Sequence, residues 1–167
     1  TLPPKPVVIT FDDGLKDQYT DAFPILKKYK FTATFFVKLN NFNQGGLTTQ
    51  MAKEMIADGM IIGSHSVNHD DMAQMDEKTL YSELKDSKNY LEKTLGIEVK
   101  YFSYPGGAFS QDTVTAVKNA GYLSAVTTKH KVYQEIITPN SLYQIPRVHI
   151  DDEMPTFIDW VQGINLH

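Results

Sequence analysis

The chain has 167 residues, a formal net charge of −4, 41% hydrophobic and 22% charged residues, and no cysteine. This length predicts one domain over residues 1–167, large enough to bury about two-thirds of the surface that its unfolded chain exposes. The acidic balance argues against nucleic acid as a partner, and the lack of a long apolar run excludes a membrane span in this chain. Without cysteine there are no disulfides, thiolate zinc sites or cysteine nucleophiles. No secretory signal peptide is recognisable.

Apolar runs and helix-capping residues predict strands that alternate with helices along the whole chain. In chain order we expect a strand at 7–11, a helix at 16–29, a strand at 32–37, a helix capped by Thr49 and ending at Gly59, a strand at 60–64, a helix from Asp76 to Gly96, a strand at 101–104, a helix from Ser110 to Gly121, strands at 122–127 and 145–150, and a short helix at 153–162.

Three details refine this pattern. Pro24 lies inside the first helix, where a proline kinks or divides it. The longest helix carries a buried face, formed by Leu80, Leu84, Leu91 and Leu95. The polar segment Asn40 to Gly46 is the one obvious rim or lid loop.

Alternation of strands and helices predicts an α/β fold with a parallel sheet and right-handed crossovers. Both an open doubly wound sheet and a barrel fit the pattern. A full eight-fold barrel needs about 250 residues, so a barrel here has to be small or incomplete. In either architecture functional sites form where the carboxyl ends of the strands meet.

Two short motifs follow apolar strands and carry chemistry. Asp12 and Asp13 end the first strand, in Thr-Phe-Asp-Asp-Gly, and His65 and His69 follow the third, in His-Ser-Val-Asn-His. Imidazole and carboxylate suit Zn²⁺ and related metals, so Asp13, His65 and His69 predict a metal site. The two histidines can share a face if a helical turn follows the strand.

The second aspartate, Asp12, is then available to accept a proton from a metal-bound water, whose pKa the metal lowers to about 7. An acid for the leaving group is also needed, and His149 near a late strand end is a candidate. Taken alone, Asp-Asp-Gly is an ordinary turn signal and His-x-x-x-His is a weak one. Their joint position at two strand ends favours the metal site.

These residues resemble the polysaccharide deacetylases, carbohydrate esterase family 4, which share the NodB homology domain. The resemblance rests on Thr10 to Gly14, on His65, Ser66 and His69, and on Phe102 to Gly107, and it runs from Val7 to about Ile150. It implies a distorted, incomplete (β/α) barrel of NodB type that removes N- or O-acetyl groups from a glycan.

The resemblance also implies roles for individual residues. Asp12 is the general base, and Asp13, His65 and His69 hold the metal, usually Zn²⁺ and sometimes Co²⁺, Ni²⁺ or Mn²⁺. Tyr104, Pro105 and Gly106 form the substrate and oxyanion segment, with the Gly106 N–H as donor, a role that needs no side chain.

The chain departs from the family pattern at two positions. Many members have an arginine in the third motif that orients the catalytic aspartate, but Ser103 or Tyr104 stands there in this chain. We expect Arg147 to supply that charge from a neighbouring strand. In the fifth motif, Leu-x-His, only His149 matches, so the acid role of His149 rests on one residue. The pattern Pro-Arg-x-x-Ile is similar to the branch with poly-N-acetylglucosamine deacetylases.

We therefore expect a metal-dependent deacetylase of an acetylated polysaccharide, such as a β-linked N-acetylglucosamine polymer, acting as a monomer outside a bacterial cell or at its surface. Two alternatives stay open. One is a metal-containing glycan-binding module that has lost turnover, and the other is an amidase for small molecules. An open groove favours the glycan, and a closed pocket favours the small molecule.

Overall fold

The structure, a computed structural model, describes residues 6–128 and 141–150. Within these residues one five-stranded parallel sheet is formed, and the strands lie side by side in their order along the chain. The strands are β1 (Ile9–Phe11), β2 (Ala33–Val37), β3 (Ile61–Ser64), β4 (Tyr101–Ser103) and β5 (Ser124–Val126). The order therefore never reverses, whereas a doubly wound sheet requires a reversal.

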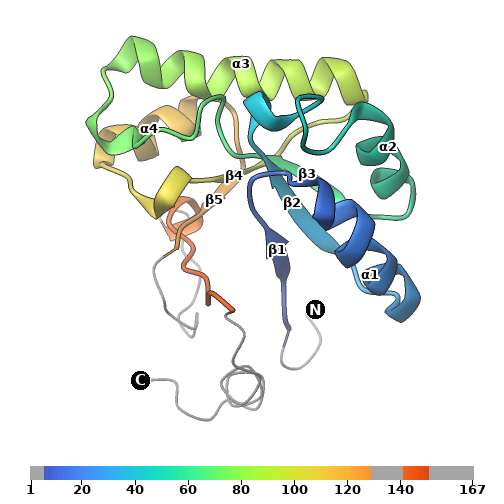
Figure 1. The fold of residues 1–167 in the computed structure, drawn as a ribbon. Helices are drawn as coiled ribbons and strands as arrows, with labels where there is room; N and C mark the ends of the chain where they lie inside the picture. The colour runs from blue at the N-terminus through green and yellow to red at the C-terminus, as the bar shows by residue number, and fades with distance from the viewer. Residues whose placement is uncertain (1–5, 129–140, 151–167) are drawn as a thin grey trace.

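Helices connect the strands on one side of this sheet (Figure 1). They are α1 (Phe23–Tyr29), α2 (Thr49–Ala57), α3 (Glu77–Leu95) and α4 (Gln111–Asn119), with short turns η1 (Gln18–Ala22), η2 (Leu39–Asn41), η3 (Met72–Gln74), η4 (Pro105–Gly107) and η5 (Ser141–Tyr143). Because right-handed crossovers between strands in sequential order all fall on the same face, the sheet curls into part of a barrel. The predicted incomplete (β/α) barrel is confirmed.

Pro24 has the predicted effect on the first helix. Residues 16–29 are helical throughout, but the turn η1 is a π-helix and α1 begins with the proline in its first turn. A proline has no N–H for the bond to the residue four positions earlier, so the preceding turn widens.

Three other boundaries need comment. The predicted strand at 145–150 is wrong: the structure has a single bridge between Val126 and Ile145 and no regular structure beyond it. Pro146 explains this, because it has no N–H to continue the ladder.

The cap of α2 is Thr48, one residue before the predicted Thr49, since the Thr48 hydroxyl accepts the N–H of Met51. The helix predicted at 153–162 lies outside the described residues.

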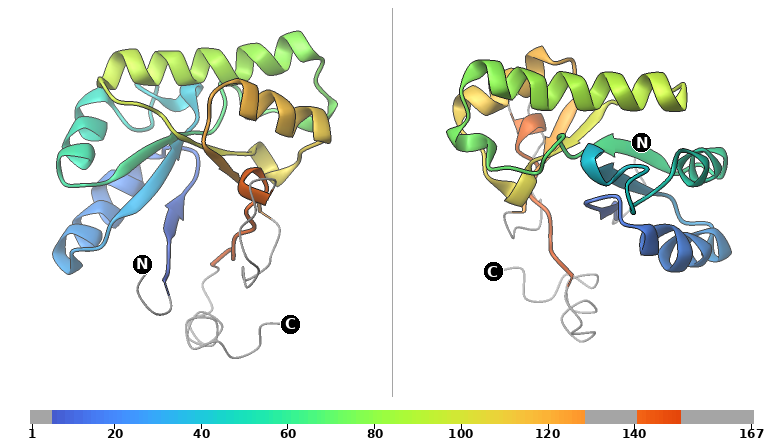
Figure 2. Two further views of the ribbon diagram at one scale, coloured as in Figure 1. Left: turned by 180° about the vertical axis from the view of Figure 1, so that it is seen from behind. Right: turned by 45° about the horizontal axis from the view of Figure 1, so that its top comes forward.

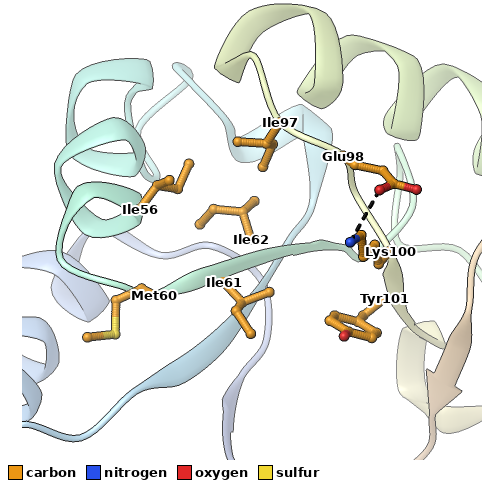
Figure 3. A pocket seen from close by; sticks show the side chains of 8 residues that line it. All are labelled: Ile56, Met60, Ile61, Ile62, Ile97, Glu98, Lys100 and Tyr101. Carbon is orange, nitrogen blue, oxygen red and sulfur yellow. Dashed lines mark ion pairs between the residues drawn. The ribbon is translucent and has the colours of Figure 1, made fainter.

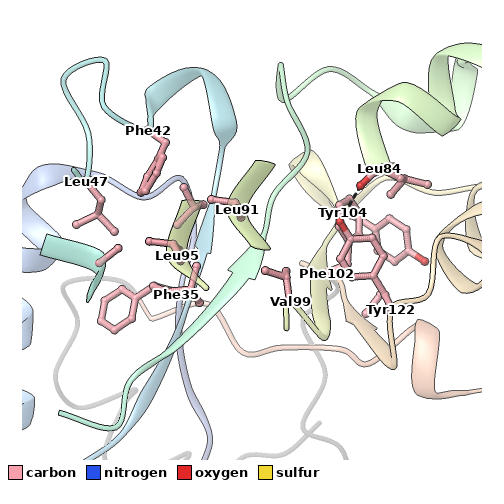
Figure 4. Packing of buried hydrophobic residues seen from close by; sticks show 14 of the residues in the cluster. Phe35, Phe42, Leu47, Leu84, Leu91, Leu95, Val99, Phe102, Tyr104 and Tyr122 are labelled. Carbon is pink, nitrogen blue, oxygen red and sulfur yellow. Dashed lines mark hydrogen bonds between the residues drawn. The ribbon is translucent and has the colours of Figure 1, made fainter. Parts of the chain in front are cut away.

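Helix α3 has the predicted caps and the predicted buried face. Asp76 accepts the N–H of Thr79 at 2.9 Å, and Gly96 ends the helix in a left-handed conformation. All four predicted leucines are buried. Figure 4 shows Leu91 and Leu95 on the side of Phe35, and Leu84 beside Tyr122, whose hydroxyl donates to the carbonyl of Leu84. The helix therefore caps most of the core.

The sheet is weakest between β3 and β4, where only Ser64 and Phe102 are paired. Below that pair the strands diverge around an apolar crevice of about 270 Å³ (Figure 3). Its lining residues are Ile56, Met60, Ile61, Ile62, Ile97, Glu98, Lys100 and Tyr101. They lie in or near the amino ends of the two strands, so the crevice is at the opposite end of the sheet from Asp12, Asp13, His65 and His69, which follow the carboxyl ends of β1 and β3.

None of the helices in the described part of the chain combines the length and hydrophobicity that crossing a bilayer requires. Figure 2 shows β1 at one edge of the curled sheet and the segment 141–150 continuing beside β5 at the other edge, and Arg147 of this segment contacts Thr10 on β1.

We expect Leu91→Ala to lower the free energy of unfolding by about 2–5 kcal/mol, because Leu91 is fully buried and truncation leaves a cavity. Urea denaturation of the variant and the parent measures the loss. Lys93→Ala on the exposed side of the same helix is the control and should change stability little. Equal stability of the two variants would contradict the placement of this helix face.

Candidate active site

The first motif lies at the end of β1, where the chain leaves the strand in a left-handed turn. Asp13 has a φ of +75°, an uncommon value for a residue with a Cβ. This turn interrupts the alternation of side chains along the strand, and both Asp12 and Asp13 reach the same rim of the barrel. Gln18 donates to the carbonyl of Asp12 at 2.5 Å and Asn41 to that of Asp13 at 3.2 Å, which fixes the turn.

The second motif follows β3 as an irregular loop, so the helical turn by which the two histidines could have shared a face is not present. Ser66 and His69 have φ values of +63° and +69°, and these two left-handed residues reverse the chain. The hydroxyl of Ser66 accepts the N–H of His69 at 3.0 Å. As a result the two imidazoles meet with ring centroids 4.7 Å apart.

Asp13, His65 and His69 come together as predicted, with one possible ligand atom from each lying within 4.8 Å of the other two. The Asp13 Oδ1 is 3.5 Å from the His69 Nε2 and 3.9 Å from the His65 Nε2. Ligands of a tetrahedral zinc ion, each about 2.0–2.2 Å from the metal, lie roughly 3.3–3.6 Å from one another. The donor set and its spacing therefore fit a divalent cation after a small contraction.

The surroundings of His65 prepare it as a ligand. Its Nδ1 lies 2.8 Å from the carbonyl oxygen of Ser103, which can only accept, so Nδ1 carries the proton and Nε2 offers a lone pair. Burial lowers the pKa of His65 below its ordinary value, even though Asp12 and the carbonyl of Ser103 act in the opposite direction. The neutral imidazole that metal binding needs is therefore favoured.

Arg147 reaches Asp12, as the sequence predicted. Its Nη1 donates to Asp12 Oδ1 at 2.8 Å and its Nη2 to Oδ2 at 2.6 Å, a two-pronged ion pair between largely buried side chains. The same guanidinium donates to the hydroxyl of Thr10 and to the carbonyl of Thr127, each at 3.0 Å. Arg147 thus joins β1 to the residue that follows β5.

The charge state of Asp12 follows from these contacts. Burial alone raises the pKa of the carboxyl, but the hydrogen bonds and charge of Arg147 outweigh it, with help from His65 and Ser103, and hold the pKa below its usual value. The stabilisation that comes with a lowered pKa is present above the ordinary pKa of aspartate and disappears as the pH falls through the lowered one. Asp12 is therefore ionised at neutral pH.

Ser103 is a site residue that the sequence reasoning noted only as the replacement of an arginine. It is fully buried at the end of β4, and its hydroxyl donates to Asp12 Oδ2 at 3.2 Å and accepts from Arg147 at 3.0 Å. Its carbonyl binds His65. The signal that could have identified Ser103 is a small polar residue at the end of a strand, opposite the predicted base.

The third motif forms the turn η4 directly after β4. Gly106 is exposed, with a φ of +59°, and a Cβ placed on it would meet no atom within 4 Å, so its backbone is open to approach. Pro105 and Tyr104 are buried, and the Tyr104 hydroxyl donates to the carbonyl of Tyr143 at 3.0 Å. The Tyr104 side chain therefore packs in the barrel wall, while Gly106 lies exposed at the rim.

The other two predicted features have different outcomes. His149 is exposed, two residues beyond Arg147, and its role as an acid stays a prediction. The polar segment Asn40 to Gly46 is bonded to both motif loops: Asn41 donates to Asp13, and the backbone N–H of Asn40 donates to the carbonyl of Val67 at 3.1 Å. It is a rim that braces the two loops.

Comparison with known proteins identifies the family to which this chain belongs. The sequence profile described as polysaccharide deacetylase matches residues 1–125. This chain belongs to the polysaccharide deacetylase family.

Two curated relatives and one solved structure illustrate the similarity. The Bacillus subtilis (strain 168) protein YxkH, which carries the same family name, is 33% identical over 90% of this chain and 53% of its own length. A poly-beta-1,6-N-acetyl-D-glucosamine N-deacetylase of Staphylococcus aureus (strain MSSA476) is 31% identical over 91% of this chain and 57% of its own. The chain thus spans slightly more than half of these curated relatives.

Among solved structures, the Streptococcus pyogenes deacetylase PplD in complex with acetate matches this deacetylase-family chain with a TM-score of 0.87 and 35% identity. The match covers 96% of this chain and 72% of PplD. It extends across β1 to β5, so the incomplete barrel is the fold of a solved family member.

We expect Arg147→Met to destabilise the protein by a few kcal/mol, since it leaves the carboxylate of Asp12 buried without its partner. The loss should be much smaller in an Asp12→Asn background, where no charge is left behind. A double-mutant cycle by urea denaturation at neutral pH measures the coupling.

Lys27→Met is the matched control, because Lys27 and Asp58 form an ion pair of the same 2.6 Å length with exposed side chains. Exposed pairs contribute little, so this variant should stay close to the parent. Equal losses for Lys27→Met and Arg147→Met would refute the special position of the Asp12 pair.

Proposed function

We propose that this chain is a metal-dependent hydrolase that removes acetyl groups from a polysaccharide. The observation that carries the proposal is the cluster of Asp13, His65 and His69, with ligand atoms within 4.8 Å of one another, beside a second aspartate held by Arg147. If the ion pair of Asp12 and Arg147 served stability alone, no set of possible metal ligands would be needed beside it. Family membership and the likeness to PplD support the same reading.

The proposed centre divides its tasks between the two aspartates. Asp13, His65 and His69 would hold a divalent cation, most simply Zn²⁺, which supplies a Lewis acid and lowers the pKa of a coordinated water. Asp12, ionised and next in the chain to the ligand Asp13, accepts a proton from the attacking water. Each carboxylate oxygen has two lone pairs, and Oδ2 accepts from both Arg147 and Ser103, so Asp12 keeps one acceptor site, on Oδ1, while it is paired with Arg147.

Arg147 acts on the reaction through Asp12. Its planar, two-pronged contact fixes the orientation of the carboxylate and keeps it deprotonated. A lysine would supply one point charge without that orientation. We therefore assign to Arg147 the task that an arginine of the third motif has in many family members.

The backbone N–H of Gly106 is the proposed donor to the oxyanion of the acetyl group. The exposed turn and the absence of a side chain leave space for a substrate carbonyl to approach. A preorganised donor placed where negative charge develops stabilises the transition state most. His149 is the candidate acid for the departing amine.

The proposed substrate is an extracellular or cell-wall glycan with acetylated amino groups. The Staphylococcus aureus relative is named for poly-beta-1,6-N-acetyl-D-glucosamine, and that name favours a β-linked N-acetylglucosamine polymer for this chain as well. An extracellular place of action follows from a substrate of this kind. Both the substrate and the place are part of the proposal.

We expect Asp12→Asn to retain the metal and lose about 10²–10⁴-fold in kcat, because the amide cannot take the proton. Acetate release from oligomers of β-1,6-linked N-acetylglucosamine, with metal content measured on the same sample, tests this. Asp58→Asn, far from the site in an exposed pair, is the matched control and should be as active as the parent. A fully active Asp12→Asn variant would exclude Asp12 as the base.

We also expect a strong chelator to abolish acetate release and added Zn²⁺ or Co²⁺ to restore it. His65→Ala should lose metal binding, because it removes a buried ligand. Activity that survives complete removal of the metal would contradict the proposal. Binding of metal and oligosaccharide without acetate release would indicate the binding module, and release from small amides alone would indicate the amidase.

A further inference from the structure

We propose that Glu83, on α3, is a positioning residue for the metal centre: its carboxylate holds the loop between the ligands His65 and His69 in its binding geometry. The inference rests on the proposed metal site and deepens it. Glu83 lies outside all three motifs, and no role in the family pattern described above falls on it.

The loop needs to be held, because its backbone is strained. Ser66 and His69 both have positive φ values, which are unfavourable for a residue with a Cβ. Such conformations persist only when the surrounding contacts enforce them. Relaxation at either residue would move the imidazole of His69 away from Asp13.

On one side the loop is held by the chain that follows β2. The N–H of His65 donates to the carbonyl of Val37 at 2.9 Å, and the N–H of Leu39 donates to the carbonyl of Ser66 at 3.0 Å. The N–H of Asn40 reaches the carbonyl of Val67 in the same way. These contacts engage mainly carbonyl groups of the loop and leave its N–H groups at Val67 and Asn68 to find other acceptors.

Glu83 provides these acceptors from the other side. Its Oε2 accepts the N–H of Val67 at 2.9 Å and that of Asn68 at 3.0 Å, and its Oε1 accepts the side-chain amide of Asn68 at 2.5 Å. Two successive N–H groups that point at one oxygen form a small anion-binding nest. All three donors belong to the segment between the two histidine ligands.

The burial of Glu83 shows how closely helix α3 and the loop between His65 and His69 depend on each other. Glu83 is only 4% exposed, on the apolar face of α3 between Leu80 and Leu84. A buried carboxylate is costly unless donors surround it, and here the loop supplies them. The three donors of the loop therefore explain why a carboxylate stands at this buried position of the helix.

Glu92, nine residues further along the same helix, is the matched comparison. It accepts the N–H of Val99 at 2.9 Å and pairs with Lys88 at 2.8 Å, so it also fixes a backbone segment by a carboxylate. That segment enters β4 at its amino end, away from the metal ligands. Loss of Glu92 therefore tests the general effect of removing such an anchor.

The experiment compares Glu83→Ala and Glu83→Gln with Glu92→Ala and Glu92→Gln. We expect Glu83→Ala to weaken zinc binding about 10–100-fold, the usual effect of removing a group that orients metal ligands. Glu83→Gln should have a smaller effect, because its amide oxygen can still accept both N–H groups while its NH₂ meets the donor of Asn68. Zinc affinity is measured by competition with a chromophoric chelator, and the absorption of bound Co²⁺ reports the ligand geometry.

Thermal unfolding of the metal-free proteins separates positioning from general stability. The Glu92 variants should lose stability and keep the zinc affinity and Co²⁺ spectrum of the parent. If both Glu83 variants also kept them, the inference would be overturned, and if Glu83→Ala did not fold, Glu83→Gln would decide. A parent that binds no zinc overturns both proposals, whereas a parent that binds zinc without releasing acetate overturns only the deacetylase function.

Discussion

The pairing of Asp12 with Arg147 is the contact on which the arrangement of this molecule depends. The five strands of the described part of the chain do not close the barrel, so β1 and β5 remain apart with polar groups at the seam. The guanidinium meets Thr10 on β1, Ser103 on β4 and the carbonyl of Thr127 beyond β5, and it also neutralises the buried carboxylate. The guanidinium of Arg147 thus bridges the open side and also orients the carboxylate of Asp12, so the stability of the seam and the orientation of Asp12 cannot be varied independently.

A parallel sheet in sequential order brings residues far apart in the chain to one rim, but it does not by itself give them a common focus. Three residues with positive φ provide that focus: Asp13 after β1, and Ser66 and His69 after β3. The strain is local, and its compensation is spread over neighbours such as Asn41 and Glu83, which bond the two loops from outside. The strands of the barrel therefore bring these residues to one rim, and the loops with positive φ values orient their side chains toward one another.

The sequence predicted most of the elements because each had a local signal: apolar runs for the strands, Asp76 and Gly96 as caps of α3, and Pro24 as the origin of the widened turn. It also predicted that Asp13, His65 and His69 come together and that Arg147 contacts Asp12. It failed at Ile145–Ile150, where an apolar pattern outweighed the missing N–H of Pro146. Glu83 was not found, because its three donors lie 15 and 16 residues away and no local pattern shows them.

Ser103 explains how the two halves of the site keep a fixed separation. β3 and β4 share one backbone pair, Ser64 with Phe102, and the next position along each strand is His65 and Ser103. There the ladder ends, and the imidazole of His65 takes the Ser103 carbonyl in place of a backbone N–H. The hydroxyl of the same serine contacts Asp12 and Arg147. β4 therefore sets the tautomer of His65 and also contacts the carboxylate of Asp12, so a shift of β4 would move both side chains relative to Asp13.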